Sequence, residues 1–218
     1  MIFFEKKGRL VCFLLFLLFC SAYVSAQNVM SILDKAASFY EDSNGLTVQF
    51  TMSIRSEKQQ ISESFEGGID IKGEKFVLKT PDMTTWFDGT NQWTYLERNE
   101  EVNVTNPSED ELQMTNPTFL LRFYKKGFNA TYKGESTGYN GKTCLDIELV
   151  PKKKKDIELV ELQIEKKTNI PTSITIVTKQ GIRSTIRINQ MKTGVNQPDS
   201  CFVFNEKEYS NAEIIDLR

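Results

Sequence analysis

Apolar and polar residues alternate along most of this chain, and the clearest example is LTVQFTMSIR at residues 46–55. Leu46, Val48 and Phe50 begin a row of apolar residues at every second position. A period of two predicts a β-strand with one buried and one solvated face, which is typical of antiparallel sheets. Similar segments bounded by turn residues predict further strands at 61–72, 75–79, 84–87, 92–96, 101–105, 128–133, 143–150, 157–166, 172–178 and 182–191, with short closing pieces at 202–204 and 213–217.

These predicted strands, about eleven of regular length, follow one another without the helices of a βαβ pattern. Asp88-Gly89 between two short strands is typical of a tight hairpin. Gly67-Gly68 inside a strand indicates a bulge or a close approach of another part of the chain. We therefore expect a mainly β fold, with one antiparallel sheet curved into a barrel or a half-barrel.

Helical spacing of the apolar residues occurs at two places. The first is residues 28–40, which are followed by the turn-forming pair Asn44-Gly45. The second is the apolar run after Pro117, which ends before Gly127. Because proline suits the first turn of a helix and glycine its end, we predict a short helix over about residues 117–125.

The N-terminus has the three parts of a secretory signal peptide. Lys6, Lys7 and Arg9 precede an apolar run at residues 10–20, and small residues follow it up to Ala26. We expect cleavage after residue 26, which leaves residues 27–218 as a single domain in an exported, periplasmic protein. The alternative is an N-terminal membrane anchor, but the run is short of the roughly 20 residues that a span needs.

The composition excludes several classes of site. The sequence contains no histidine, so a Ser-His-Asp triad, a Cys-His dyad and a histidine-bearing zinc site are all impossible. The net charge is −2, and a mildly acidic chain without a basic pattern has no broad attraction for nucleic acid. We expect no metal, no cofactor and no nucleic-acid partner, and we expect a monomer.

Two cysteines remain after removal of the signal peptide, Cys144 and Cys201. In an oxidising compartment they could form a disulfide, and two buried free thiols are the alternative. The lysine run at 152–155 could bind a phosphate or a lipid head group, but its position between two strands favours a charged hairpin tip. The acidic residues, including those at 109–111, fit a solvated surface better than the paired carboxylates of a hydrolase.

The order of several motifs resembles the periplasmic carriers of outer-membrane lipoproteins, the LolA-type family. After the helix come LTVQFTMSI, the glycine-bearing FEGGIDIK and WFDGTNQWTYLERNEEVNV, with its Asp-Gly turn and charged turn. NPTFLLRFY is similar to the short helix of the family, and the segment from IPTSITIV to CFVF is similar to its closing hairpin. The resemblance extends over nearly the whole mature chain.

The resemblance implies an incomplete antiparallel β-barrel with short helices forming a lid over an apolar cavity. In the family this cavity takes the acyl chains of lipoproteins, which an inner-membrane ABC transporter releases and an outer-membrane acceptor receives. On this implication the aromatic residues would surround a hollow, whereas residue types alone favour a filled core. The expected cavity residues are Val48, Phe50, Met52, Phe65, Ile69, Phe76, Trp86, Trp93, Tyr95, Phe119, Leu120 and Phe123.

Two details stay open in the sequence. Either Trp86 or Phe87, and either Trp93 or Tyr95, would face the cavity, because neighbouring strand residues point to opposite sides. The family's lid-holding arginine is also missing, since Gly73 stands at the expected place; Lys72 or Lys75 could replace it without the planar fork of arginine. A sensor for another lipid and a carboxylate hydrolase are the alternatives to a carrier.

Overall fold

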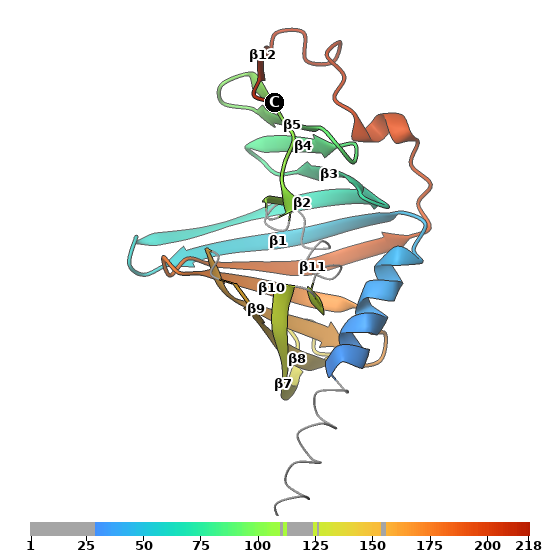
Figure 1. The fold of residues 1–218 in the computed structure, drawn as a ribbon, viewed down its shortest axis with the longest axis vertical. Helices are drawn as coiled ribbons and strands as arrows, with labels where there is room; N and C mark the ends of the chain where they lie inside the picture. The colour runs from blue at the N-terminus through green and yellow to red at the C-terminus, as the bar shows by residue number, and fades with distance from the viewer. Residues whose placement is uncertain (1–28, 110, 113–123, 126, 154–155) are drawn as a thin grey trace, which may run out of the picture.

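A computed structural model gives the structure of the chain, and it describes residues 29–109, 111–112, 124–125, 127–153 and 156–218. The dominant element is one sheet of twelve strands with the order β12-β6-β5-β4-β3-β2-β1-β11-β10-β9-β8-β7 (Figure 1). The strands are β1 (Leu46–Ser56), β2 (Ile61–Lys72), β3 (Lys75–Lys79), β4 (Met83–Phe87), β5 (Gln92–Leu96), β6 (Glu101–Thr105), β7 (Phe128–Thr137), β8 (Thr143–Pro151), β9 (Ile157–Glu165), β10 (Pro171–Thr178), β11 (Arg183–Thr193) and β12 (Glu213–Asp216).

The sheet is open, with β7 at one edge and β12 at the other. All neighbouring strands are antiparallel except β12, which runs parallel to β6 and pairs Ile214 with Val102. The prediction of a mainly β, incompletely closed antiparallel structure is confirmed, and β12 is the closing piece predicted at 213–217. The predicted helix at 117–125 lies largely outside the described residues. Of its residues only Tyr124 and Lys125 are described, and both are helical.

Local residue chemistry explains the turns and the packing of the central strands. In the β4–β5 turn, the Asp88 carboxylate accepts hydrogen bonds from the backbone amides of Thr90 and Asn91, both at 2.8 Å, and Gly89 takes a φ of +105°. In β2, a Cβ on Gly67 would lie 2.5 Å from Cζ of Phe50. Glycine is therefore required there so that the Phe50 ring can lie against the backbone of β2.

The two faces of the sheet are covered by different parts of the chain. We call the face that carries Val48 and Phe50 the helix face, because the helical residues 29–41 pack on it. Strand alternation extends this face from β7 to β4, where the cross-strand partners Phe76 and Phe87 belong to it. The opposite side of the sheet is called the outer face.

The C-terminal segment crosses the outer face of β3 to β6. It contains a short 3₁₀ helix, η1 (Asp199–Phe202), and then β12. Phe202 and Phe204 pack there with Val77 and Trp86. The prediction of a strand piece at 202–204 is wrong, since this apolar pair anchors η1 and the following coil rather than joining the sheet.

The disulfide that the sequence allowed is not formed. Cys144 is a buried free thiol and Cys201 an exposed one. Cys144 lies on β8, where its sulfur is 3.5 Å from the hydroxyl of Thr172, whereas Cys201 lies in η1, which contacts β3. Five strands separate β3 from β8 in the sheet, so each thiol meets different neighbours. Among the described residues, no helix has the length and apolarity needed to cross a membrane.

Candidate functional site

The helix face brings together six of the twelve residues expected to line an apolar site. Val48, Phe50, Ile69 and Phe76 are buried members of one cluster. Val48 lies opposite Ile69 in the β1–β2 pairing. The strands that carry these residues alternate regularly, so a single apolar surface follows directly from the period of two.

Part of this surface is only half covered. Met52 and Phe65 are cross-strand partners on β1 and β2, and both side chains are half-buried. On the other side of β1, Met52 pairs with Ile186 of β11. The half-buried apolar side chains of this region are Met52, Ile54, Phe65, Met83, Ile186, Ile188 and Met191. Large, partly accessible apolar side chains in one continuous row are suited to contact with hydrocarbon.

The outer face holds three of the expected residues instead. Trp86 pairs with Trp93, and Thr84 with Tyr95, so Trp86, Trp93 and Tyr95 share one face, and they pack with the C-terminal segment. Of the neighbours Trp86 and Phe87, it is Phe87 that lies on the helix face. The structure therefore does not bring the two tryptophans together with Phe50 and Phe76. Trp93 and Tyr95 are two residues apart on β5, so both point to the same side of the sheet, which is the outer face. The expectation that one of them would face the cavity is therefore wrong.

Phe119, Leu120 and Phe123 lie outside the described residues. The described residues on either side of them contact the helix face. Leu112 is a buried member of the cluster around Phe76, and Tyr124 belongs to the cluster that includes the helical residues 29–41.

Tyr124 also connects to the helix through a polar contact. Its hydroxyl donates a hydrogen bond of 2.6 Å to the carboxylate of Asp34, which is also 2.5 Å from the ammonium of Lys125. The bonds from Lys125 and then Tyr124 hold the pKa of Asp34 below its usual value. The pKa of Tyr124 is raised by its burial and by this contact with the carboxylate, so both partners keep the charge states that the bond needs at neutral pH.

Lys72 and Lys75 bind the C-terminal segment. The Lys72 ammonium donates to the carbonyl of Gln197 at 2.8 Å and to the Asp199 carboxylate at 3.1 Å. Lys75 donates to the other oxygen of Asp199 at 2.8 Å. These bonds hold η1 against the β2–β3 turn. In the described part of the chain both lysines thus bind the C-terminal segment, whereas the sequence offered them as replacements for the lid-holding arginine.

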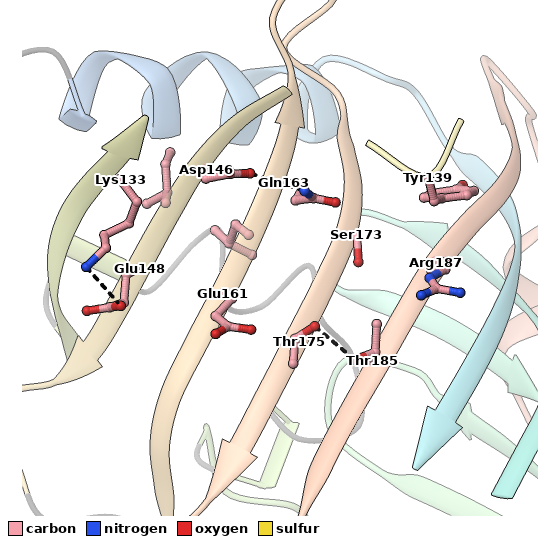
Figure 2. Close-up of a pocket in the computed structure, with 12 residues that line it drawn as sticks. Lys133, Tyr139, Asp146, Glu148, Glu161, Gln163, Ser173, Thr175, Thr185 and Arg187 are labelled. Atoms are coloured by element: carbon pink, nitrogen blue, oxygen red, sulfur yellow. Dashed lines mark hydrogen bonds and ion pairs between the residues drawn. The ribbon is translucent and has the colours of Figure 1, made fainter. Parts of the chain in front are cut away.

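A second candidate site is a polar groove on the outer face of β7 to β11. It has a volume of about 560 Å³. Figure 2 shows its side chains on one side of neighbouring strands, with Lys133 at one end and Tyr139 at the other. Sequence reasoning missed it because its residues come from six separate segments. Its labelled polar residues are Lys133, Tyr139, Asp146, Glu148, Glu161, Gln163, Ser173, Thr175, Thr185 and Arg187.

The described part of the chain contains no cluster of side chains that is arranged as a metal site. There, no group of three or more cysteine, aspartate and glutamate side chains is placed to hold a metal ion. The groove carboxylates are instead paired within the protein, for example Glu148 with Lys133 at 3.4 Å.

Sequence comparison identifies the family. The family model described as "Outer membrane lipoprotein carrier protein LolA" matches residues 20–181. The chain belongs to the LolA family. The resemblance seen in the sequence motifs is thereby confirmed. No curated protein matches the chain.

Several solved structures are similar to this chain at low sequence identity. An uncharacterized conserved protein from Thermus thermophilus has a TM-score of 0.57 and 11% identity, over 87% of this chain and 99% of that one. A LolA superfamily protein from Nitrosomonas europaea has a TM-score of 0.46 and 12% identity, over 81% and 97%. The Mycobacterium tuberculosis lipoprotein LppX has a TM-score of 0.47 and 14% identity, over 79% and 99%. At these identities the comparison concerns the fold alone.

Proposed function

We propose that this LolA-family protein is a periplasmic carrier that holds the acyl chains of lipoproteins on its helix face and ferries them to the outer membrane. The observation that carries the proposal is the half-covered apolar row of β1, β2 and β11, which includes Met52 and Phe65. The family model that matches this chain is described as an outer-membrane lipoprotein carrier, which supports the proposal.

The chemistry of that row suits hydrocarbon chains of varied length. Methionine side chains are unbranched and polarisable, so they adapt to different neighbours. Met52, Met83 and Met191 all pack at the margin of the helix-face cluster. Around Met52 the cross-strand partners on the helix face are apolar, namely Phe65 and Ile186, so an acyl chain there meets few unpaired donors or acceptors.

Energetics define the partners that such a carrier needs. Transfer of one acyl methylene from water to an apolar site stabilises by about 0.8 kcal/mol. A chain of about sixteen carbons therefore prefers hydrocarbon to water by on the order of 10 kcal/mol. Unaided extraction from a bilayer would be too slow, so we propose that an inner-membrane ABC transporter loads the protein. An outer-membrane acceptor with a higher affinity would unload it. One monomer would carry one lipoprotein.

Two experiments test this function. Native mass spectrometry of protein purified from the cell envelope is expected to reveal bound acylated polypeptide. Depletion of the protein is expected to leave lipoproteins in the inner membrane, as measured by membrane fractionation. Bound lipid together with normal lipoprotein sorting would contradict the carrier and favour a sensor of another lipid. A purified protein without any acylated ligand would contradict both.

A further inference from the structure

The polar groove on the outer face has the size of a ligand site. Its volume of about 560 Å³ falls within the range of about 300–1,000 Å³ that is typical of small-molecule sites. The groove crosses the strands β8 to β11, and the apolar cluster that holds the helix lies on the other side of the same strands. A ligand in this groove would therefore not compete with an acyl chain on the helix face.

The floor of the groove offers buried hydroxyl groups. Ser173 and Thr175 on β10 are each only 7% exposed. Thr175 shares a hydrogen bond of 2.9 Å with Thr185 of β11. The Ser173 hydroxyl makes no side-chain hydrogen bond to the described residues, although it points into the groove (Figure 2). A hydroxyl that is free to bond on the floor of a groove favours a ligand that can donate or accept a hydrogen bond, because such a ligand can replace water as its partner.

The charges of the groove cancel in pairs. Lys133 pairs with Glu148 at 3.4 Å, and Arg183 at the margin pairs with Glu161. The remaining acid is Asp146, which accepts hydrogen bonds from Ser136 at 2.8 Å and from Gln163 at 3.2 Å. The remaining base is Arg187. The three acids of the groove are balanced only when Arg183 at the margin is counted with Lys133 and Arg187, so a strongly charged ligand gains little from the groove as a whole.

Tyr139 supplies the one large ring of the groove. It comes from the turn between β7 and β8, and its hydroxyl donates to the backbone carbonyl of Ile188 on β11. The guanidinium carbon of Arg187 lies 5.9 Å from the ring centre. The ring is 43% exposed, so a flat apolar surface stands fixed beside a floor of hydroxyl, amide and carboxylate groups (Figure 2).

These features together describe one class of ligand. A sugar has hydroxyl groups that both donate and accept hydrogen bonds, which matches paired acceptors and donors such as Asp146, Gln163 and Ser173. The C–H face of its ring packs on an aromatic ring such as Tyr139. A purely apolar ligand would leave the polar groups unpaired. We propose that the outer-face groove binds a neutral oligosaccharide, either free or as the glycan part of a larger envelope molecule.

The test measures sugar binding to protein that comprises residues 27–218. Isothermal titration calorimetry would use four neutral tetrasaccharides as probes: chitotetraose, cellotetraose, maltotetraose and mannotetraose. At least one is expected to bind. Ser173→Ala is expected to weaken that binding at least about fivefold, because it removes a hydrogen-bonding partner of the sugar from the floor of the groove. Asp146→Asn is expected to weaken it further, because the amide cannot accept the same set of hydrogen bonds.

A matched control lies on the same face outside the groove. Ser64→Ala removes an exposed serine hydroxyl of β2 and is expected to leave sugar binding unchanged. Circular dichroism and binding of a fluorescent fatty acid would show that each variant still folds. If none of the four tetrasaccharides binds to protein that still binds the fatty acid, the proposal is overturned while the carrier function stands. It is likewise overturned if inorganic phosphate or a sulfated disaccharide binds instead and Arg187→Gln abolishes that binding.

Discussion

Trp86 of β4 and Tyr209 of the C-terminal segment pack edge to face, with their ring centres 5.4 Å apart. Tyr209 also lies 4.7 Å from the ring of Tyr95 and 5.4 Å from that of Phe204. The aromatic residues of the β4–β5 hairpin therefore form the docking surface of the C-terminal segment. Their size reflects this second core on the outer face, separate from the surface proposed to hold lipid.

Phe202 is expected to be the main apolar anchor of the C-terminal segment. It is fully buried, at 0% exposed, whereas its neighbour Val203 is 42% exposed. Phe202→Ala should lower the free energy of unfolding by about 3–5 kcal/mol, as is typical of a buried phenylalanine. Val203→Ala should change it by no more than about 0.5 kcal/mol. Urea denaturation measures both, and equal effects would contradict the packing described for this segment.

The ion pairs of Asp199 are expected to make stability depend on pH. Hydrogen bonds from Lys75 and then Lys72 hold the pKa of Asp199 below its usual value of 3.8. Its contribution is therefore fully present above pH 3.8 and is lost as the pH falls further through the folded-state value. The difference in unfolding free energy between the native protein and Asp199→Asn should shrink over that acidic range. It should also shrink at high salt, because these groups are exposed.

The control for Asp199 is Glu206→Gln. Glu206 is an exposed residue of the following turn, and its replacement removes the same charge without breaking the contacts of Lys72 and Lys75. A pH-dependent difference as large for Glu206→Gln as for Asp199→Asn would mean that overall charge, and not the ion pairs, is responsible.

Met52 and Ser53 offer a test of which face binds acyl chains. They are adjacent on β1 and equally half-buried, but Met52 joins the helix-face cluster whereas Ser53 contacts Ser64 on the outer face. Met52→Glu should weaken binding of a diacylated lipopeptide by about tenfold or more, since each lost methylene contact is worth about 0.8 kcal/mol. Ser53→Glu should leave it unchanged. Equal losses in a fluorescence titration would contradict the assignment of the acyl site to the helix face.

Tyr124→Phe tests the polar connection between the helix and the segment around residue 124. The lost hydrogen bond to Asp34 should lower the free energy of unfolding by about 1 kcal/mol. Tyr132→Phe is the control, because Tyr132 packs at the edge of the same cluster and its hydroxyl has no hydrogen-bond partner among the described residues. Equal changes in thermal unfolding would rule out a specific role for this bond.

In protein that begins at residue 27, the two thiols of Cys144 and Cys201 are expected to react differently. Cys201 is exposed and Cys144 is buried, and reactivity requires an accessible thiolate. A maleimide should therefore label the folded protein once, at Cys201, and the denatured protein twice. Mass spectrometry would count the labels, and an unlabelled folded protein would indicate that the two cysteines are bonded after all.

The period of two was sufficient to predict most of the sheet. The predicted strands at 75–79, 92–96 and 101–105 match β3, β5 and β6, because each has clear turn residues at both ends. The period of two could not show which face of β3 and β4 carries which side chains, since both strands have apolar residues on both sides, for example Phe76 beside Val77. Only a distant partner, the C-terminal segment, decides that Val77 and Trp86 belong to the outer face.

The polar groove was equally inaccessible to sequence reasoning. Glu148 and Glu161 lie directly opposite each other across β8 and β9, yet in the sequence they are two outward-facing acids among many. Their proximity depends on the register of the strands and on the turn that carries Tyr139. The shared apolar cluster of Phe50 and Ile69 could be predicted, in contrast, because neighbouring strands of a regular hairpin keep apolar residues in line.

The parallel pairing of β12 with β6 links the final residues of the chain to a strand made about halfway through synthesis. Until Glu213–Asp216 have joined the sheet, the backbone groups along that side of Glu101–Thr105 have no strand beside them. Unpaired strand edges recruit other chains and promote aggregation. Loss of Glu213–Asp216 would therefore leave the apolar interior in place but make the protein prone to aggregate.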